Sequence, residues 1–214
     1  MAVFRDMDDH LSDEEQEELL AVVIRRKLVV LPTDTVYGIG ADPFSRKAVS
    51  RLLQAKGRDQ TMPPPILGGN PMALLGLAHF DNEGQERFVR RLAARFWPGP
   101  LSIVVKAGRE VGWDTSSVNG TIALRMPAHP VSLAVLRATG PLAVTSANRT
   151  GMVPAQTVEE AREYFGDEVA IYVDGGVASS PVPSTVVDCT GEEPQVIRVG
   201  EVTLAEVREL LPSQ

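Results

Sequence analysis

Three segments of the sequence share one design: an apolar, strand-like run adjoins small side chains that carry a hydroxyl or an amide group. They are residues 28–35 (LVVLPTDT), 142–148 (LAVTSAN) and 183–188 (PSTVVD). Strand ends in a mixed sheet commonly line a crevice, where short polar groups can hydrogen-bond a small ligand and still leave room for it. Ordinary turns, in which each polar side chain bonds its own backbone, explain any one segment as well. Because three such segments occur in one chain, a shared cavity is the hypothesis to test against three separate turns.

A second candidate feature is the pair of cations in Lys56-Gly57-Arg58, which follows a predicted helix over residues 46–55. If residues 56–58 are extended, side chains at i and i+2 point to the same side, so the two cations can hold one polyanion. Lysine acts as a point charge, whereas the planar fork of arginine suits a phosphate or a carboxylate. The alternative is that both cations merely cap the dipole of the helix. The prolines at 63–65 would keep the following segment extended.

Two further arginines stand at the ends of apolar strands. Arg125 follows the run TIAL at 121–124, and Arg198 alternates with Ile197 and Val199. A half-exposed strand explains each arginine when it is taken alone. Arginines at several strand ends of an acidic protein are also what an anionic ligand would need.

Charge and composition exclude several classes of function. The 214 residues include 21 basic and 28 acidic side chains, a net charge of −7, which argues against a surface that is basic throughout and made for nucleic acid. The net charge does not exclude a local basic groove. The single cysteine, Cys189, cannot form an internal disulfide or a zinc site of two or more cysteines, and the three histidines are isolated. We therefore predict no metal site made by the protein, and a reducing, cytoplasmic environment.

The common nucleotide and membrane signals are absent. No G-x-x-x-x-G-K-[ST] motif occurs, and Gly38-Ile39-Gly40 lacks the third glycine of a dinucleotide fingerprint, so any nucleotide must be bound by another device. The apolar runs at 19–24 and 28–31 are far shorter than the roughly 20 residues that cross a bilayer. The acidic N-terminus is the opposite of a signal peptide. We expect no membrane association.

The elements that must position these residues can be predicted from periodicity and capping signals. Ser12-Asp13-Glu14-Glu15 has the form of a capping box and predicts a helix over 13–27, followed by a buried strand over 28–31. Further helices are predicted over 46–55, 71–78, 84–96, 130–138, 157–165 and 203–211. Further strands are predicted over 101–106, 121–126, 141–145, 169–173, 184–189 and 195–199. Because helices and strands mix without a regular βαβ alternation, we predict one α/β (α+β) domain over 12–212 with a twisted mixed sheet, preceded by a tail over 1–11.

The predicted helix over 84–96 carries an arginine stripe, formed by Arg87, Arg91 and Arg95, beside its apolar face. A solvated helix surface is the favoured interpretation, and contact with RNA phosphates is the alternative.

Six blocks together resemble one family. They are PTDTVYGIGAD at 32–42, KGR at 56–58, WPGPLS at 97–102, ALRMP at 123–127, SANRTG at 146–151 and PSTVVD at 183–188. In order and spacing they resemble the YrdC-like threonylcarbamoyl-AMP synthases over about residues 12–210. The resemblance implies an α/β fold around a large positively charged cavity. It also implies formation of L-threonylcarbamoyladenylate and pyrophosphate from L-threonine, bicarbonate and ATP, after which a partner transferase modifies tRNA at the adenosine beside the anticodon.

The resemblance also implies roles for particular residues. The catalytic positions fall on Lys56, Arg58, Ser146 and Asn148; the threonine positions on Thr35, Arg125, Val144 (through its backbone) and Ser184; and the ATP positions on Arg58, Met62, Thr121, Ser146, Pro154 and Arg198. Arg125 can take the threonine carboxylate as a bidentate pair. Positioning and charge stabilisation by Lys56 and Arg58, with Mg²⁺ carried on the triphosphate, should drive the reaction.

The sequence departs from the family in three places. Leu67 stands where many relatives have a histidine that contacts threonine, and the Pro63–Pro65 run could alter the loop over ATP. The chain ends soon after Arg198, so it resembles the short, single-domain form. Two alternatives stay open: an RNA-binding protein of the same fold, which binds double-stranded RNA or tRNA, and a paralogous carbamoyl-transfer enzyme.

Overall fold

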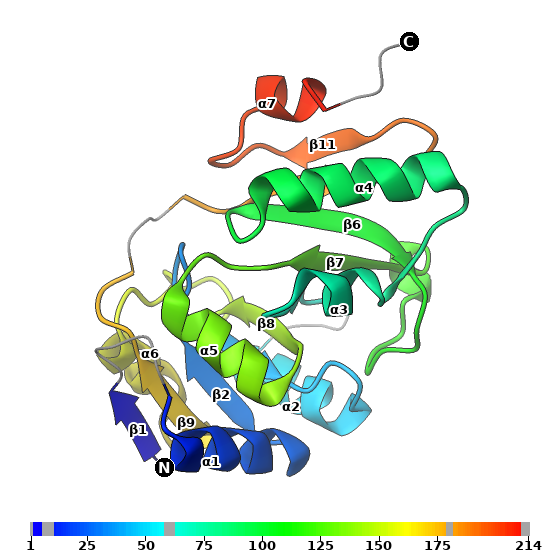
Figure 1. Cartoon of the computed structure of the whole chain (residues 1–214). Helices are drawn as coiled ribbons and strands as arrows, with labels where there is room; N and C mark the ends of the chain where they lie inside the picture. The colour runs from blue at the N-terminus through cyan, green and yellow to red at the C-terminus, as the bar shows by residue number, and fades with distance from the viewer. Residues whose placement is uncertain (1, 6–10, 58–62, 179–181, 211–214) are drawn as a thin grey trace.

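The computed structural model describes residues 2–5, 11–57, 63–178 and 182–210, and all its strands join into one mixed sheet (Figure 1). The strands are β1 (Ala2–Arg5), β2 (Leu28–Leu31), β3 (Gly38–Ala41), β4 (Ile66–Leu67), β5 (Ala78–His79), β6 (Leu101–Ala107), β7 (Thr121–Arg125), β8 (Leu142–Ser146), β9 (Val169–Asp174), β10 (Thr185–Asp188) and β11 (Gln195–Arg198). Their order across the sheet is β1-β9-β2-β3-β8-β4-β7-β6-β10-β11, and β5 pairs with β6. The predicted α/β fold with a mixed sheet is confirmed.

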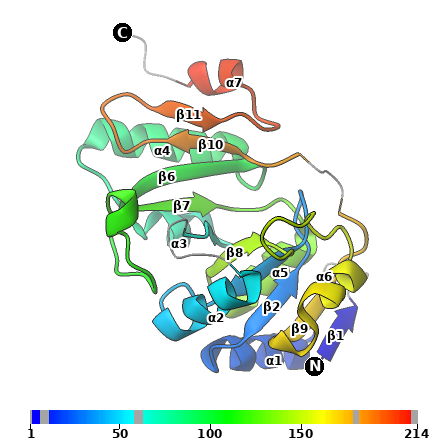
Figure 2. The same ribbon diagram turned by 180° about the vertical axis from the view of Figure 1, so that it is seen from behind.

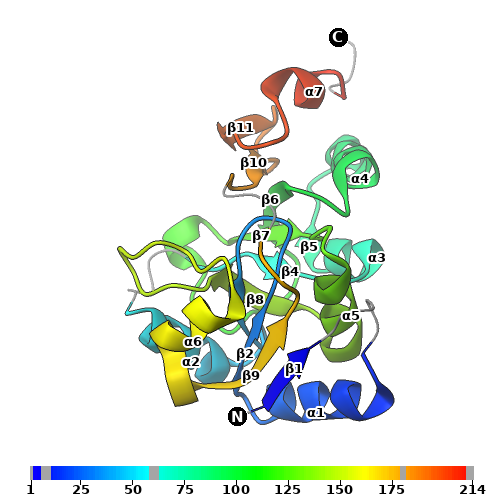
Figure 3. The same ribbon diagram turned by 90° about the vertical axis from the view of Figure 1, so that its left-hand side faces the viewer.

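Helices cover both faces of this sheet. They are α1 (Asp13–Ile24), α2 (Arg46–Lys56), α3 (Pro71–Leu75), α4 (Glu83–Phe96), α5 (Pro130–Thr139), α6 (Val158–Phe165) and α7 (Leu204–Arg208), with short 3-10 turns at Ser116–Val118 and Gly166–Glu168. Figure 3 shows α2 and α6 on one face and α1, α3, α4 and α5 on the other, and Figure 2 brings α2 and α6 to the front. The helix α7 lies beside β11 at the far edge. Within the described ranges, no helix is long and apolar enough to cross a membrane.

Burial on both faces explains why β2 reads as a continuous apolar run. Alternate residues of this strand point to opposite faces, so Leu28 and Val30 belong to one hydrophobic cluster and Val29 and Leu31 belong to a second. A strand that is covered on both sides has no polar face and therefore shows no alternation. Because β2 is buried within the sheet, the position of the residues that follow it, 32–37, is well defined at their first residue.

The starts of the helices follow the capping signals closely. Ser12 forms the predicted capping box with Glu15. The helix α1 ends at Ile24, three residues before the predicted end, because Arg26 takes a left-handed conformation with φ of 59° that breaks the helical path. The predicted helices over 71–78 and 203–211 also end early, at Leu75 and Arg208. The other predicted helices agree within one or two residues.

Four strands were not predicted, and one of them, β3, shapes the site. It pairs antiparallel with β2 and β8, so residues 32–37 form the loop of a β2–β3 hairpin. Its glycines hide it from pattern analysis, yet a Cβ on Gly38 would come within 2.5 Å of Val144 Cγ1. The strand β1 lies in the segment expected to be a tail and pairs in parallel with β9. The other two, β4 and β5, have only two residues each, which is too short for a periodic signal.

Candidate active site

One cavity of about 850 Å³ lies against the sheet and gathers the polar residues of all three segments singled out in the sequence. Its walls include Thr33 and Thr35 from the β2–β3 loop, Thr145 and Ser146 from β8, and Ser184 before β10. Strands β6, β7 and β11 add Ser102, Val104, Thr121, Ala123, Arg125, Ile197 and Arg198. Binding sites for small molecules have volumes of about 300–1,000 Å³. The predicted shared cavity is present, and it is large enough for two small substrates.

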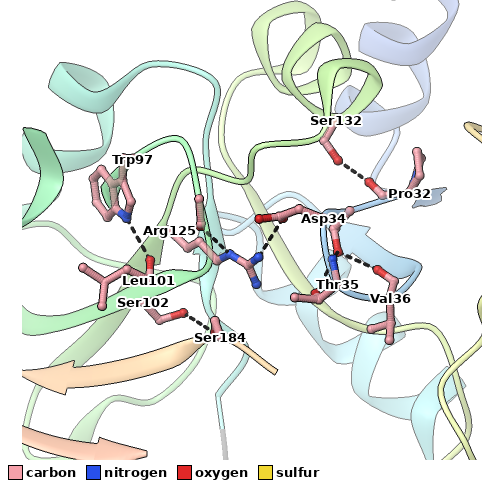
Figure 4. A network of polar contacts seen from close by, with 12 residues as sticks. Pro32, Asp34, Thr35, Val36, Trp97, Leu101, Ser102, Arg125, Ser132 and Ser184 are labelled. Carbon is pink, nitrogen blue, oxygen red and sulfur yellow. Dashed lines mark hydrogen bonds and ion pairs between the residues drawn. The ribbon is translucent and has the colours of Figure 1, made fainter. Parts of the chain in front are cut away.

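Arg125 is the central cation of this cavity. Its side chain is only 8% exposed, and its Nε donates a hydrogen bond to the Gly99 carbonyl at 3.1 Å. Its Nη2 donates to Asp34 Oδ1 at 2.7 Å. These two bonds occupy the edge of the guanidinium formed by Nε and Nη2. In Figure 4 the third nitrogen points away from both bonds, into the space between Ser184 and Thr35. The edge formed by Nη1 and Nη2 is therefore the one that can take a bidentate anion.

The two threonines of the β2–β3 loop have a defined direction of hydrogen bonding. Thr33 Oγ1 donates to the Val36 carbonyl at 2.6 Å, so its only proton is used. The 3.0 Å contact between the Thr33 and Thr35 hydroxyls must then have Thr35 as its donor. Thr35, which lines the cavity, consequently presents lone pairs to a ligand. It can accept a hydrogen bond from an amine or a hydroxyl group.

A second arginine is held next to Ser184. Arg198 donates from Nε to the Ser184 carbonyl at 2.9 Å and from Nη2 to Ser184 Oγ at 3.0 Å. Ser184 Oγ also lies 3.0 Å from Ser102 Oγ. Partial burial and the positive charge of Arg125 lower the pKa of Arg198. The two guanidinium groups thus act on the same region, which favours a ligand with more than one negative charge.

The strand β8 offers one backbone carbonyl to the cavity. The Val144 amide donates to the Pro65 carbonyl at 2.9 Å, one residue beyond the antiparallel pairing of Ile66 in β4 with Ala143 in β8. In an antiparallel pair of this kind the partner returns the bond, but Pro65 has no N–H. Proline therefore leaves the Val144 carbonyl able to accept a hydrogen bond from a ligand.

Lys56 is buried behind Ser146. Its ammonium donates to the Ser146 carbonyl at 2.5 Å and to Asn148 Oδ1 at 3.1 Å, and the residue is only 3% exposed. The condition of an extended 56–58 segment is not met at its start, because Lys56 is the last residue of α2 and Gly57 caps the helix with φ of 61°. The side chain reaches the end of β8, so it does more than cap a dipole. The sequence expectation for Arg58 and Met62 falls outside the described residues.

The remaining candidates and the missed residues can also be placed. Thr121 and Pro154 line the cavity, and Thr121 Oγ1 donates to the Val118 carbonyl at 2.7 Å. Sequence analysis assigned no individual role to Asp34, Ser102 or Tyr37. All three lie within the PTDTVYG and WPGPLS blocks, but their partners, such as Arg125 for Asp34 and Ser184 for Ser102, are far away in the sequence.

The acidic residues near the cavity do not fit a metal centre. No group of three His, Cys, Asp or Glu side chains able to hold a metal ion occurs in the part of the chain that the structure describes. Asp188 lines the cavity alone and accepts two hydrogen bonds from Thr190, while Asp34 is paired with Arg125.

Comparison with known proteins identifies relatives over most of the chain. A family model for Sua5, YciO and YrdC, described as "Telomere recombination", matches residues 22–200. A Mycobacterium tuberculosis protein named "Putative threonylcarbamoyl-AMP synthase" is 45% identical over 185 residues, which are 86% of this chain and 83% of that protein. The threonylcarbamoyl-AMP synthase of Thiobacillus denitrificans is 34% identical over 181 residues, covering 81% of this chain and 90% of that protein.

A solved structure agrees with this relationship. The crystal structure of Pyrococcus abyssi Sua5 complexed with L-threonine superimposes with a TM-score of 0.85 and 30% identity. The match covers 98% of this chain and 60% of that one. The fold around the cavity is therefore shared with a protein that holds threonine.

Proposed function

The chain belongs to the family of Sua5, YciO and YrdC proteins, and we propose that its cavity makes L-threonylcarbamoyladenylate from L-threonine, bicarbonate and ATP. It is a threonylcarbamoyl-AMP synthase, a nucleotidyltransferase that serves threonylcarbamoyladenosine modification of tRNA. The observation that carries the proposal is the buried Arg125 guanidinium, which has a bidentate edge facing a cavity lined by hydroxyl and carbonyl acceptors. A carboxylate and an amine attached to the same carbon would satisfy both features, and an α-amino acid has that arrangement.

In this proposal threonine is bound by complementary donors and acceptors. Its carboxylate takes the Nη1–Nη2 edge of Arg125, and its amine donates to the lone pairs of Thr35 and to the Val144 carbonyl. Ser184 is available for the hydroxyl group of the substrate. Leu67, which lines the cavity, makes that part of the wall apolar.

The adenylate forms in two steps that require charge stabilisation. The threonine nitrogen attacks the carbon of bicarbonate, a C–N bond forms and water leaves, which gives the carbamate. A carbamate oxygen then attacks the α-phosphorus of ATP, and the bond to the bridging oxygen breaks to release pyrophosphate. Negative charge builds at the carbamate and at the leaving group, so Arg198, Lys56 and Arg58 are the proposed stabilising groups. Thr121, Ser146, Met62 and Pro154 are the proposed contacts of ATP, and Asn148 positions Lys56.

Mg²⁺ belongs to the nucleotide substrate in this proposal. It would enter with the triphosphate, with phosphate and water oxygens as its ligands. The acidic side chains that the structure describes at the cavity do not form a metal site. The protein needs no nucleophilic side chain. Burial raises the pKa of the Cys189 thiol to about 12, so this residue is not a reactive thiolate.

The product has an activated carbonyl group, so we propose that a transferase acting on tRNA consumes it, and that both steps occur in the cytoplasm. The experiment that tests the proposal is pyrophosphate release from Mg·ATP and bicarbonate, with and without L-threonine. We expect release that depends on threonine. Release without threonine, or no release together with tight, salt-sensitive RNA binding, would contradict it.

A further inference from the structure

We propose that Asp34 is a positioning residue for threonine, which acts by holding Arg125 in the orientation that receives the carboxylate. The proposal rests on the proposed function and extends it to a residue outside the expected threonine and ATP positions. Asp34 bonds Arg125 Nη2 at 2.7 Å, and the side chains are 15% and 8% exposed. Asp34 is absent from the lining of the cavity, whereas Thr33 and Thr35 on either side of it line the cavity.

Two anchors fix the plane of the guanidinium. The Gly99 carbonyl holds Nε and Asp34 holds Nη2, and both lie on the same edge of the planar group. One hydrogen bond alone would let the group turn about that bond, whereas two bonds set both its plane and its direction. The adjacent edge, formed by Nη1 and Nη2, then faces the cavity before a ligand arrives. This preorganisation is what makes a bidentate contact with a carboxylate strong.

The anchors come from parts of the chain that the fold brings together. Asp34 lies in the β2–β3 loop, and Arg125 is the last residue of β7, 91 residues away in the sequence. Figure 4 shows the ion pair joining these two segments. The loop also carries Thr35, the acceptor for the threonine amine, so one ion pair sets the distance between the two groups that bind the substrate.

A competing role for Asp34 makes the opposite prediction. A carboxylate next to Arg125 could simply repel the carboxylate of threonine and weaken its binding. Removal of the charge would then strengthen threonine binding, whether or not the hydrogen bond is kept. If Asp34 positions Arg125, the hydrogen bond matters more than the charge. Asp34→Asn keeps an oxygen that can accept from Nη2, and Asp34→Ala removes it.

The test is calorimetric binding of L-threonine, and of L-threoninol, which lacks the carboxylate. We expect Asp34→Ala to raise the Kd for threonine at least about tenfold, as loss of a charge-assisted hydrogen bond should. Asp34→Asn should stay within about threefold of the original protein. The preference for threonine over threoninol should fall in Asp34→Ala as it does in Arg125→Lys, and the double variant should bind no worse than Arg125→Lys alone. The affinity for ATP should not change.

Matched variants separate positioning from folding. Asp42→Ala, which removes a hydrogen bond to the Phe44 amide elsewhere in the fold, should leave the threonine Kd unchanged. If Asp34→Ala does not fold, Asp34→Ser, whose hydroxyl is too short to reach Nη2, replaces it. Unchanged or tighter threonine binding by the disruptive variant overturns this inference alone. Failure of the original protein to bind threonine overturns the proposed function instead.

Discussion

Two arginines of α4 and the arginine at the end of β7 make ion pairs of similar length in opposite surroundings. On α4, Arg87 and Arg90 pair with glutamates one turn earlier, at 3.1 Å and 2.7 Å. Arg125 pairs with Asp34 at 2.7 Å. The side chain of Arg87 is 70% exposed, and that of Arg125 is 8% exposed. Distance therefore does not distinguish the two regions, but burial does.

Burial changes what each charge can do. An exposed pair of charges is screened by water and contributes roughly 0–1 kcal/mol to stability. Breaking a buried pair costs about 3–5 kcal/mol, because the remaining charge has lost its solvent as well as its partner. A buried cation beside a cavity can therefore attract an anion strongly, whereas the paired arginines of α4 are engaged within their own helix. Within the stripe of Arg87, Arg91 and Arg95, this supports the solvated-face interpretation for Arg87.

The largest effect in this comparison of buried and exposed cations is expected at Lys56. We expect Lys56→Ala to reduce threonine-dependent pyrophosphate release at least about tenfold, because a buried positive charge beside the reacting groups is lost. The matched control is Lys47→Ala, which removes an exposed lysine from the same helix, α2, and should leave the rate unchanged. Equal effects of the two variants would show that burial does not separate functional cations from solvated ones. Arg58→Ala, tested in the same assay, should lower the rate by at least about tenfold as well.

Arg125→Lys sharpens the comparison by keeping the charge and removing the fork. Lysine cannot make a bidentate contact with a carboxylate, so the Kd for threonine should rise about tenfold while the affinity for ATP changes little. Arg90→Lys, at a pair with the same 2.7 Å distance on α4, is the control and should have no effect on threonine. Both affinities can be measured by calorimetry. An unchanged threonine Kd in Arg125→Lys would place the carboxylate elsewhere.

Local signals predicted the elements and the polar strand ends, whereas tertiary pairing determined the rest. Apolar runs and helix caps depend only on residues that are close together in the sequence, so β2 over 28–31 and α4 were predictable. The strand β3 was missed because Gly38 and Gly40 have no strand propensity and are chosen for contact with β8. Asp34 was missed for a related reason. A carboxylate between two threonines is typical of a turn, and its ion pair with Arg125 is formed only in the folded structure.

Thr33→Val tests the direction of the hydrogen bond between the Thr35 and Thr33 hydroxyls. Without the Thr33 oxygen, the Thr35 hydroxyl loses its acceptor and can turn its proton toward the cavity. A donor would then face the amine of threonine, so we expect the threonine Kd to rise about fivefold, in the range of one lost hydrogen bond. L-threonine binding measures this effect. Thr139→Val, at the end of α5, removes a hydroxyl that bonds only local backbone carbonyls and should not change threonine binding.

The smallest effect is expected at the exposed ion pairs of α4. Arg87→Ala breaks the pair with Glu83, and we expect the free energy of unfolding to fall by about 0.3–0.5 kcal/mol at low salt. Because the charges are solvated, the difference should shrink in 1 M salt, where exposed charges are screened within about 3 Å. Urea unfolding at the two salt concentrations measures it, and pyrophosphate release should be unchanged. A loss of turnover or of tRNA modification in Arg87→Ala would mean that α4 meets an anionic partner, since neither the small change in stability nor the distance from the cavity could account for it.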